Sequence, residues 1–224
     1  RAIVLSPSKD ELAGRYCVAL RWIAWLVLLV TIWPAQADDM DHELAEARSV
    51  FLRGVDGDKR AVRDALQRFR SLNQDYPQEP VFIAYLGACM TLQGRDAANN
   101  IEKGRLTDEG LGEIDRALKL LSESADQGSP RYLDTLLVAA NSFIHIPSFF
   151  NRYDEGKRLL QEILAHRGFD GMAVGFKAAT YMAAALVAHG AGDEKKYRRY
   201  LDLTVSTDPE GRDGGFASKL LEEH

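Results

Sequence analysis

Apolar residues recur every three or four positions along the chain after residue 37, which is the spacing of one face of an α-helix. Short polar stretches with glycine, proline or aspartate separate these stripes. No stretch shows the alternation of a β-strand, so the pattern predicts an all-α fold. About eight helices are expected, followed by a short final one over 216–222; they cover residues 38–51, 59–76, 80–94, 107–121, 130–145, 149–167, 172–189 and 194–208.

The stretch 80–121 indicates how these helices are arranged. Residues 80–94 are apolar nearly all round, which is typical of a helix in the interior, whereas 107–121 has one apolar stripe and one charged face. The two helices predict a hairpin interrupted by a polar insertion, Arg95 to Arg105. Such a hairpin cannot bury both apolar faces alone, so the sequence predicts stacked antiparallel helix hairpins, an α-solenoid.

Residues that suit a helix start precede several of the predicted helices. Asp58, Thr107, Ser148 and Asp193 each stand where a side-chain oxygen accepts hydrogen bonds from the first turn. The acidic group at 38–41 is expected to do the same for the first helix and to favour its positive end. These residues therefore predict where the helices begin.

Residues 1–37 have the order of a signal peptide. Arg15 and Arg21 precede an apolar run over 22–32, and Ala35-Gln36-Ala37 provides small residues for cleavage. The uncharged run is shorter than the roughly 20 residues that span a bilayer. We expect cleavage after Ala37 and a periplasmic or secreted domain over 38–224; the alternative is an inner-membrane anchor through 22–37. Because the first residue is Arg, residues 1–14 are interpreted as a non-native extension.

Composition narrows the classes of partner. The chain has 224 residues, 46% of them hydrophobic and 27% charged, as expected for one globular domain. Residues 38–224 carry a net charge of −7 and no long basic run, so nucleic acid is not an expected partner. No stable membrane span is expected after cleavage. Cys89 is the one cysteine beyond the leader, and its apolar neighbours favour burial over a reactive thiol.

Small and aromatic residues recur at fixed spacing in three parts of the chain. The carboxy-terminal part carries Tyr181, Ala184, Ala185, Ala188, Gly192, Tyr197, Leu201, Thr204 and Pro209; the central part carries Ile83, Leu86, Gly87, Gly110, Ile114, Ala117 and Leu118; the amino-terminal part carries Ala65, Phe69, Leu72 and Pro77. This pattern resembles the tetratricopeptide repeat, a helix pair of about 34 residues. Around Arg95-Asp96 and 147–152 the chain is also similar to a group of exported bacterial repeat proteins.

The resemblance implies a protein or peptide partner held on the concave surface formed by the first helix of each pair. It implies no reaction and no cofactor. The residues on these helices that could line the groove are Tyr85, Asn141, His145, Met182 and His189. Each of them could equally be an interior residue. Homo-oligomerisation through an apolar end of the array also stays open.

Two further segments could take part in recognition. The insertion beginning with Arg95 and Asp96 interrupts a regular hairpin, and such loops often carry binding residues, although a plain surface insertion is the alternative. Phe149 and Phe150 could form an exposed aromatic anchor beside Arg152. Aromatic residues at the start of an amphipathic helix more often belong to the core, so both interpretations are kept.

The patterns of known catalytic and metal sites are missing from the sequence. The histidines are scattered singly, and no phosphate loop or nucleophile motif is found. Asp56 and Asp58 lack the remaining ligands of a calcium loop, so we expect them to cap a helix. The sequence thus favours a non-catalytic adaptor without metal or cofactor. The alternative is an accessory component of a transport system that binds a small ligand near Tyr85 and His145.

Overall fold

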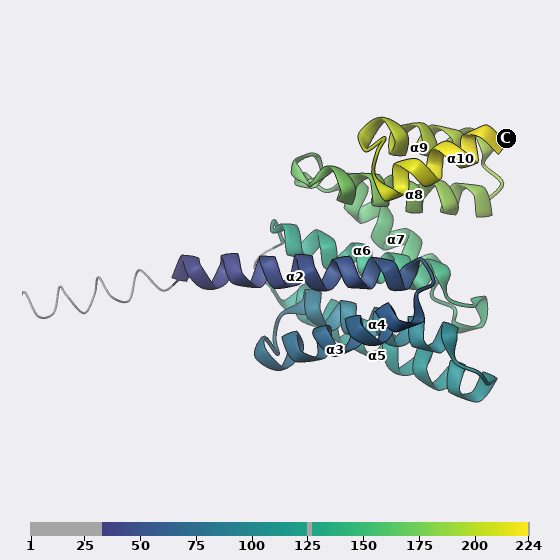
Figure 1. Ribbon diagram of the computed structural model, residues 1–224. Helices are drawn as coiled ribbons and strands as arrows, with labels where there is room; N and C mark the ends of the chain where they lie inside the picture. The colour runs from purple at the N-terminus through teal and green to yellow at the C-terminus, as the bar shows by residue number, and fades with distance from the viewer. Residues whose placement is uncertain (1–32, 125–126, 224) are drawn as a thin grey trace, which may run out of the picture. The chain divides into compact units, whose positions relative to one another are not determined.

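The computed structural model describes residues 33–124 and 127–223, and within them every regular element is a helix (Figure 1). This confirms the predicted all-α class. The α-helices of this part of the chain are α2 (Trp33–Val55), α3 (Lys59–Asp75), α4 (Pro80–Asp96), α5 (Asn100–Glu123), α6 (Pro130–His145), α7 (Tyr153–Ala165), α8 (Val174–Gly190), α9 (Glu194–Thr207) and α10 (Arg212–Glu223). Two 3₁₀ turns, η1 (Ser148–Phe150) and η2 (Phe169–Gly171), flank α7.

The chain divides into two units at Arg48, within α2. The described part of the first unit is helical and buries Leu44 and Ala47. The cap predicted at 38–41 is wrong, because α2 begins at Trp33 and runs through the expected cleavage point. Pro34 does not prevent this, since proline is tolerated in the first turn of a helix. The rest of the predicted leader, residues 1–32, lies outside the described residues.

The second unit is built from helix pairs that stack on one another. The pairs are α4 with α5, α6 with α7, and α8 with α9. Each first helix also packs on the next, α4 on α6 and α6 on α8, and each second helix packs on the following first helix. α10 covers α8 and α9. Contacts thus join mainly neighbours along the chain, as in a repeat array, and the predicted stack of helix hairpins is confirmed.

α4 is the most buried helix of this unit, as predicted. Every residue from Val81 to Cys89 is buried, and Pro80 occupies the first turn, where its missing N–H costs nothing. Cys89 is fully buried, and this burial raises the pKa of its thiol. The prediction of a buried rather than reactive cysteine is confirmed.

Glycines allow α4 and α5 to pack backbone against backbone. A Cβ atom built on Gly87 would lie 2.5 Å from the carbonyl oxygen of Gly110. One built on Gly94 would lie 2.5 Å from the hydroxyl of Thr107. Real Cβ atoms do not approach so closely, so this crossing requires glycine.

The polar insertion predicted over Arg95 to Arg105 is mostly helix, so that prediction was wrong. α5 begins at Asn100, because the Asn99 side chain accepts a 2.9 Å hydrogen bond from the backbone N–H of Glu102. An ion pair between Arg105 and Glu109 supports the exposed face. Thr107, the predicted cap, is buried inside the helix.

Of the other three predicted caps, two are confirmed and one is wrong. Asp58 accepts hydrogen bonds from the N–H groups of Arg60 and Ala61, and these bonds hold the pKa of its carboxyl below the ordinary 3.8. Asp193 caps α9 in the same way. Ser148 instead begins η1, and Asn151 follows it in the left-handed conformation (φ 55°), which interrupts the predicted long helix before α7.

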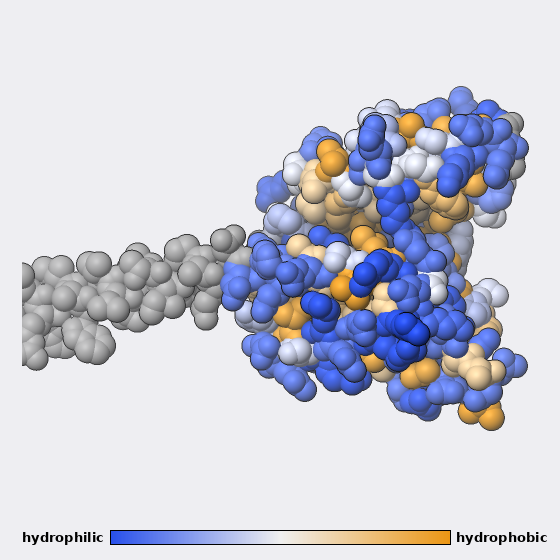
Figure 2. All heavy atoms as spheres, viewed as in Figure 1, coloured by the Kyte–Doolittle hydropathy of each residue, from blue (hydrophilic) through white to orange (hydrophobic). Residues whose placement is uncertain are grey.

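Among the apolar clusters in the described part of the second unit, two lie between the later helices of the stack. The larger joins buried residues of α5, α6, α7 and α8, and the smaller joins α8, α9 and α10. Hydrophilic side chains predominate on the face seen in Figure 2, with smaller apolar patches among them. Across residues 33–124 and 127–223, no helix has both the length and the apolar character needed to cross a membrane.

Candidate functional site

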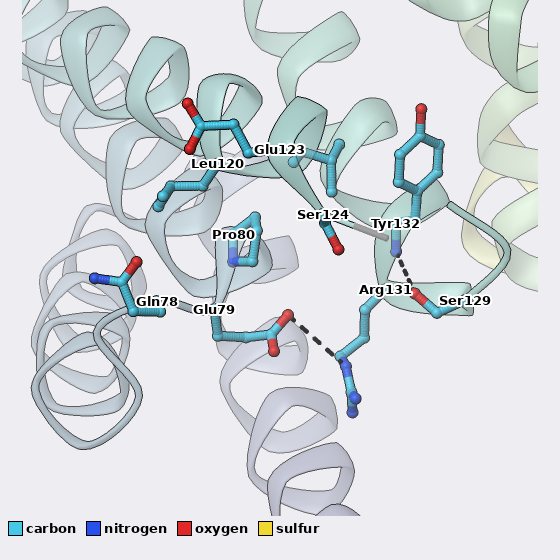
Figure 3. Close-up of a pocket in the computed structure, with 10 residues that line it drawn as sticks. Gln78, Glu79, Pro80, Leu120, Glu123, Ser124, Ser129, Arg131 and Tyr132 are labelled. Carbon is cyan, nitrogen blue, oxygen red and sulfur yellow. Dashed lines mark hydrogen bonds and ion pairs between the residues drawn. The ribbon is translucent and has the colours of Figure 1, made fainter. Parts of the chain in front are cut away.

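A recess of about 430 Å³ opens where the first turns of α4 and α6 meet the last turn of α5 (Figure 3). Its walls come from the α3–α4 loop, the end of α5 and the start of α6. The lining residues are Gln78, Glu79, Pro80, Leu120, Leu121, Glu123, Ser124, Ser129, Arg131 and Tyr132. The recess lies at one edge of the hairpin stack, because consecutive first helices begin at the same edge.

Two polar interactions shape this recess. The Glu79 carboxylate and the Arg131 guanidinium face each other, with Oε1 and Nε 3.8 Å apart (Figure 3). The Ser129 hydroxyl accepts a 3.1 Å hydrogen bond from the backbone N–H of Tyr132 and so caps α6. Both side chains of the ion pair are about a quarter exposed, at 24% and 27%, so they remain accessible to a bound molecule.

Tyr132 connects the recess to α7. Its hydroxyl donates a 3.1 Å hydrogen bond to Glu162, and burial together with this carboxylate raises the pKa of the phenol. The phenol therefore stays protonated at neutral pH and acts as a donor.

The lining chemistry suits hydrogen bonding to a peptide. It combines two carboxylates, one guanidinium and two serine hydroxyls, whereas its apolar part comes from Pro80 and two leucines. Pockets for small molecules are mostly apolar with few polar groups. The recess is more polar than that, and a peptide backbone offers donors and acceptors at regular intervals.

Arg95 and Asp96 lie at the end of α4 and cap the C-terminus of another helix, α2. Arg95 donates hydrogen bonds to the backbone carbonyls of Gly54 (2.9 Å) and Val55 (3.2 Å), which are the last carbonyls of α2. Asp96 holds the guanidinium from the side at 2.9 Å. Basic side chains stabilise helix C-termini in this way. The structure thus places this predicted pair in a helix cap.

Tyr85 and Met182 lie in the interior. Tyr85 is 4% exposed; its ring stacks on Phe69 at a centroid distance of 4.6 Å, and its hydroxyl donates to Asp134. Met182 is 5% exposed and belongs to the cluster of α8, α9 and α10. Of the two interpretations kept for these residues, the structure places both side chains in the core.

Asn141, His145 and His189 reach the surface. Asn141 and His145 lie one turn apart near the end of α6, and the His145 Nδ1 donates to the Asn141 carbonyl at 2.8 Å. His189 is exposed at the end of α8, with its ring 4.8 Å from that of Tyr197. The structure therefore brings the first two together on one helix.

The two phenylalanines of η1 differ in environment. Phe149 is 72% exposed, whereas Phe150 is half-buried and packs against the larger apolar cluster. Their ring centroids are 4.4 Å apart. Phe149 therefore lies on the surface and Phe150 belongs with the core, while the role of Phe149 as a binding anchor stays a prediction.

Arg152 joins α7 to α5. Its guanidinium donates to both oxygens of Asp115, at 2.9 Å for the Nη1–Oδ2 pair, and its Nε donates to Glu155. The same group lies 3.9 Å from the centroid of the Phe143 ring. The hydrogen bond to Asp115 raises the pKa of this guanidinium. Arg152 is thus a structural link between neighbouring hairpins.

Replacing Arg152 by glutamine should lower the free energy of unfolding by about 1 kcal/mol, because the bidentate pair with Asp115 is lost. The Arg152 side chain is 18% exposed, although that of Asp115 is half exposed. Arg105→Gln is the matched control, since its pair with Glu109 is about half exposed and should contribute only about 0.3 kcal/mol. Urea denaturation measures both changes. Equal losses of unfolding free energy in the two variants would show that the Arg152–Asp115 pair stabilises the fold no more than an exposed surface pair.

Glu79 and Arg131 were missed by sequence reasoning. Each is adjacent to a proline that opens a first helix, Pro80 or Pro130. In a stack of hairpins the first helices are parallel, so their starts lie at one edge. The position of both residues at a helix start is the signal from which their proximity could have been predicted. The 51 residues between them hide it in the linear sequence.

Among the residues that the structure describes, no three His, Cys, Asp or Glu side chains gather as a metal site would require. No family model, curated protein or solved structure matches the chain.

Proposed function

We propose that the protein is an exported, periplasmic helical-repeat adaptor that binds a protein or peptide and catalyses no reaction. The observation that carries this proposal is the packing of α4 on α6 and of α6 on α8, which sets the first helices of successive hairpins side by side. In stacked repeats, such a row forms the extended binding surface. The resemblance to the tetratricopeptide repeat supports the same function.

Because α4 is buried from Val81 to Cys89, the accessible groups of this row that a peptide could contact lie at its edge and on α6. At its amino-terminal edge lies the recess with Glu79 and Arg131, and on α6 lie Asn141 and His145. Polar side chains buried beneath this surface make hydrogen bonds within the protein, as the Tyr85 hydroxyl does to Asp134. What remains accessible is suited to reversible hydrogen bonding.

Site-specific photo-crosslinking in the producing cells tests the proposal. The full chain, with a carboxy-terminal affinity tag, carries a photo-reactive residue at Arg131 or His145. Matched controls carry it at Lys119 of α5 or Gln161 of α7, which are exposed on second helices. We expect a discrete protein adduct from the first-helix positions and none from the controls. Absence of any adduct at both first-helix positions contradicts the proposal.

The recess also favours a second candidate, a small-ligand component of a transport system. Its volume of about 430 Å³ is large enough for a metabolite, and it lies beside Arg131 rather than near Tyr85. A ligand at one hundred times its Kd should stabilise the fold by about 2.7 kcal/mol. A thermal-shift screen of metabolites checks this, with Arg131→Ala as the variant that should lose the shift. An adaptor should show no shift with any of them.

A further inference from the structure

The outward face of α9 carries a cluster of cations. The inner side of this helix packs on α8 and α10 through Tyr197, Leu201 and Thr204 (Figure 1). The opposite side lines an open recess of about 480 Å³, formed by Lys195, Arg198, Arg199, Asp202, Leu203 and Ser206. This surface belongs to a second helix and is separate from the row of first helices.

Two of these cations are not compensated locally. Lys196 pairs with Asp193 at 2.8 Å and Arg198 with Glu194 at 3.2 Å. Within residues 33–124 and 127–223, no carboxylate lies within 4.0 Å of the charged nitrogens of Lys195 or Arg199. The recess holds three cations against the single carboxylate of Asp202, in a chain whose net charge is −5. Charge complementarity therefore points to an anionic partner.

The composition of this recess distinguishes between kinds of anion. Helices that lie on membranes insert large apolar side chains, and none of the exposed large hydrophobic residues in the described part of the chain is on α9. A nucleic-acid backbone carries a negative charge at every nucleotide, so it would place one beside the Asp202 carboxylate in the same recess. An acidic protein segment fits better, because it is short and places its charges at discrete positions.

We propose that this face binds an extended acidic segment of a partner protein. Lys195 and Arg199 are four residues apart, a rise of about 6 Å along the helix. Alternate residues of an extended chain are separated by about 6.6 Å, so two carboxylates with one residue between them reach both cations. The next alternate position reaches Leu203. The expected segment therefore has acidic residues at its first and third positions and an apolar residue at its fifth.

Fluorescence anisotropy with defined peptides tests this assignment. The full chain is titrated with labelled Glu-Ala-Glu-Ala-Leu and with Gln-Ala-Gln-Ala-Leu at low salt. We expect saturable binding of the acidic peptide, about tenfold tighter than that of the glutamine peptide, because charge-assisted hydrogen bonds are lost in the latter. The variant K195E/R199E should weaken the acidic peptide by about tenfold or more. Both positions are exposed, and residue 195 lies in the first turn of α9, where a glutamate suits the helix dipole.

The matched control is K59E/R63E on α3, which makes the same change in net charge at exposed positions. It should leave the affinity unchanged within about twofold, because distant exposed charges are screened. Circular dichroism confirms that both variants fold. Equal weakening by both pairs overturns the proposal, as does an absence of peptide binding up to about 1 mM. Binding to phosphatidylglycerol vesicles that is lost in K195E/R199E, without peptide binding, also overturns it in favour of a membrane.

Discussion

Replacing Gly110 by alanine is expected to lower the free energy of unfolding by about 1–3 kcal/mol. The new Cβ would lie 2.6 Å from the carbonyl oxygen of Gly87 and 2.9 Å from the backbone nitrogen of Thr91. These are backbone atoms and cannot rotate away, so α4 and α5 must separate. Separation loosens the contacts of the most buried helix in the stack. Urea denaturation followed by circular dichroism gives the change.

Gly112, two residues further along α5, provides the control. A Cβ at this position meets no atom within 4 Å, so only the gain in helix propensity remains. Gly112→Ala should therefore raise the free energy of unfolding by about 0.5–1 kcal/mol. The two substitutions are chemically identical and should have opposite signs. If Gly110→Ala also stabilises the protein, α4 and α5 do not cross as closely as described.

Phe143→Ala should have a larger effect, a loss of about 3–5 kcal/mol. Phe143 is fully buried in the cluster of α5, α6, α7 and α8, and the Arg152 guanidinium lies on its ring. Removing the ring leaves a cavity and also withdraws the surface on which the guanidinium is held. Both the α6–α7 hairpin and its link to α5 are weakened. The measurement is the shift of the denaturation midpoint with an unchanged slope.

Phe149→Ala is the matched control, because this phenylalanine is 72% exposed. Its removal should change the free energy of unfolding by less than about 0.5 kcal/mol. A loss of stability comparable to that of Phe143→Ala would mean that the η1 turn is packed rather than exposed. If the crosslinked partner disappears with Phe149→Ala while stability is retained, the aromatic anchor interpretation gains direct support.

The candidate site could be predicted only in part. Its prolines and the serine cap follow from local sequence, because their interactions reach only a few residues along the chain. The interactions that place the polar side chains join distant residues: Arg95 with Gly54, Arg152 with Asp115, and the Glu79–Arg131 pair. Asp56, expected to cap a helix, instead accepts from Arg212 of α10 at 2.9 Å. None of these partners follows from helical periodicity.

Besides the distant partners of polar side chains, the sequence left open which side chains are exposed to solvent. Tyr85 and Arg95 fall on or beside a first helix, where the resemblance places binding residues. Tyr85 became a core residue because neighbouring helices pack around it. Arg95 stays exposed, but its guanidinium is used to cap the end of α2. The start of α5 was misplaced for a related reason. In its first six residues the one apolar side chain is Ile101, which is exposed, so no apolar stripe reveals the start of the helix.

The sequence by itself determined the helical class, most helix positions, the caps at Asp58 and Asp193, and the burial of Cys89. These features depend on the 3.6-residue periodicity and on hydrogen bonds between near neighbours in the chain. Tertiary structure decided which polar residues remain accessible, because burial depends on the helices stacked above and below. It also formed the recess between α4, α5 and α6, which exists only when separate hairpins pack together. The outer face of α9 is left open because no other described helix packs against it.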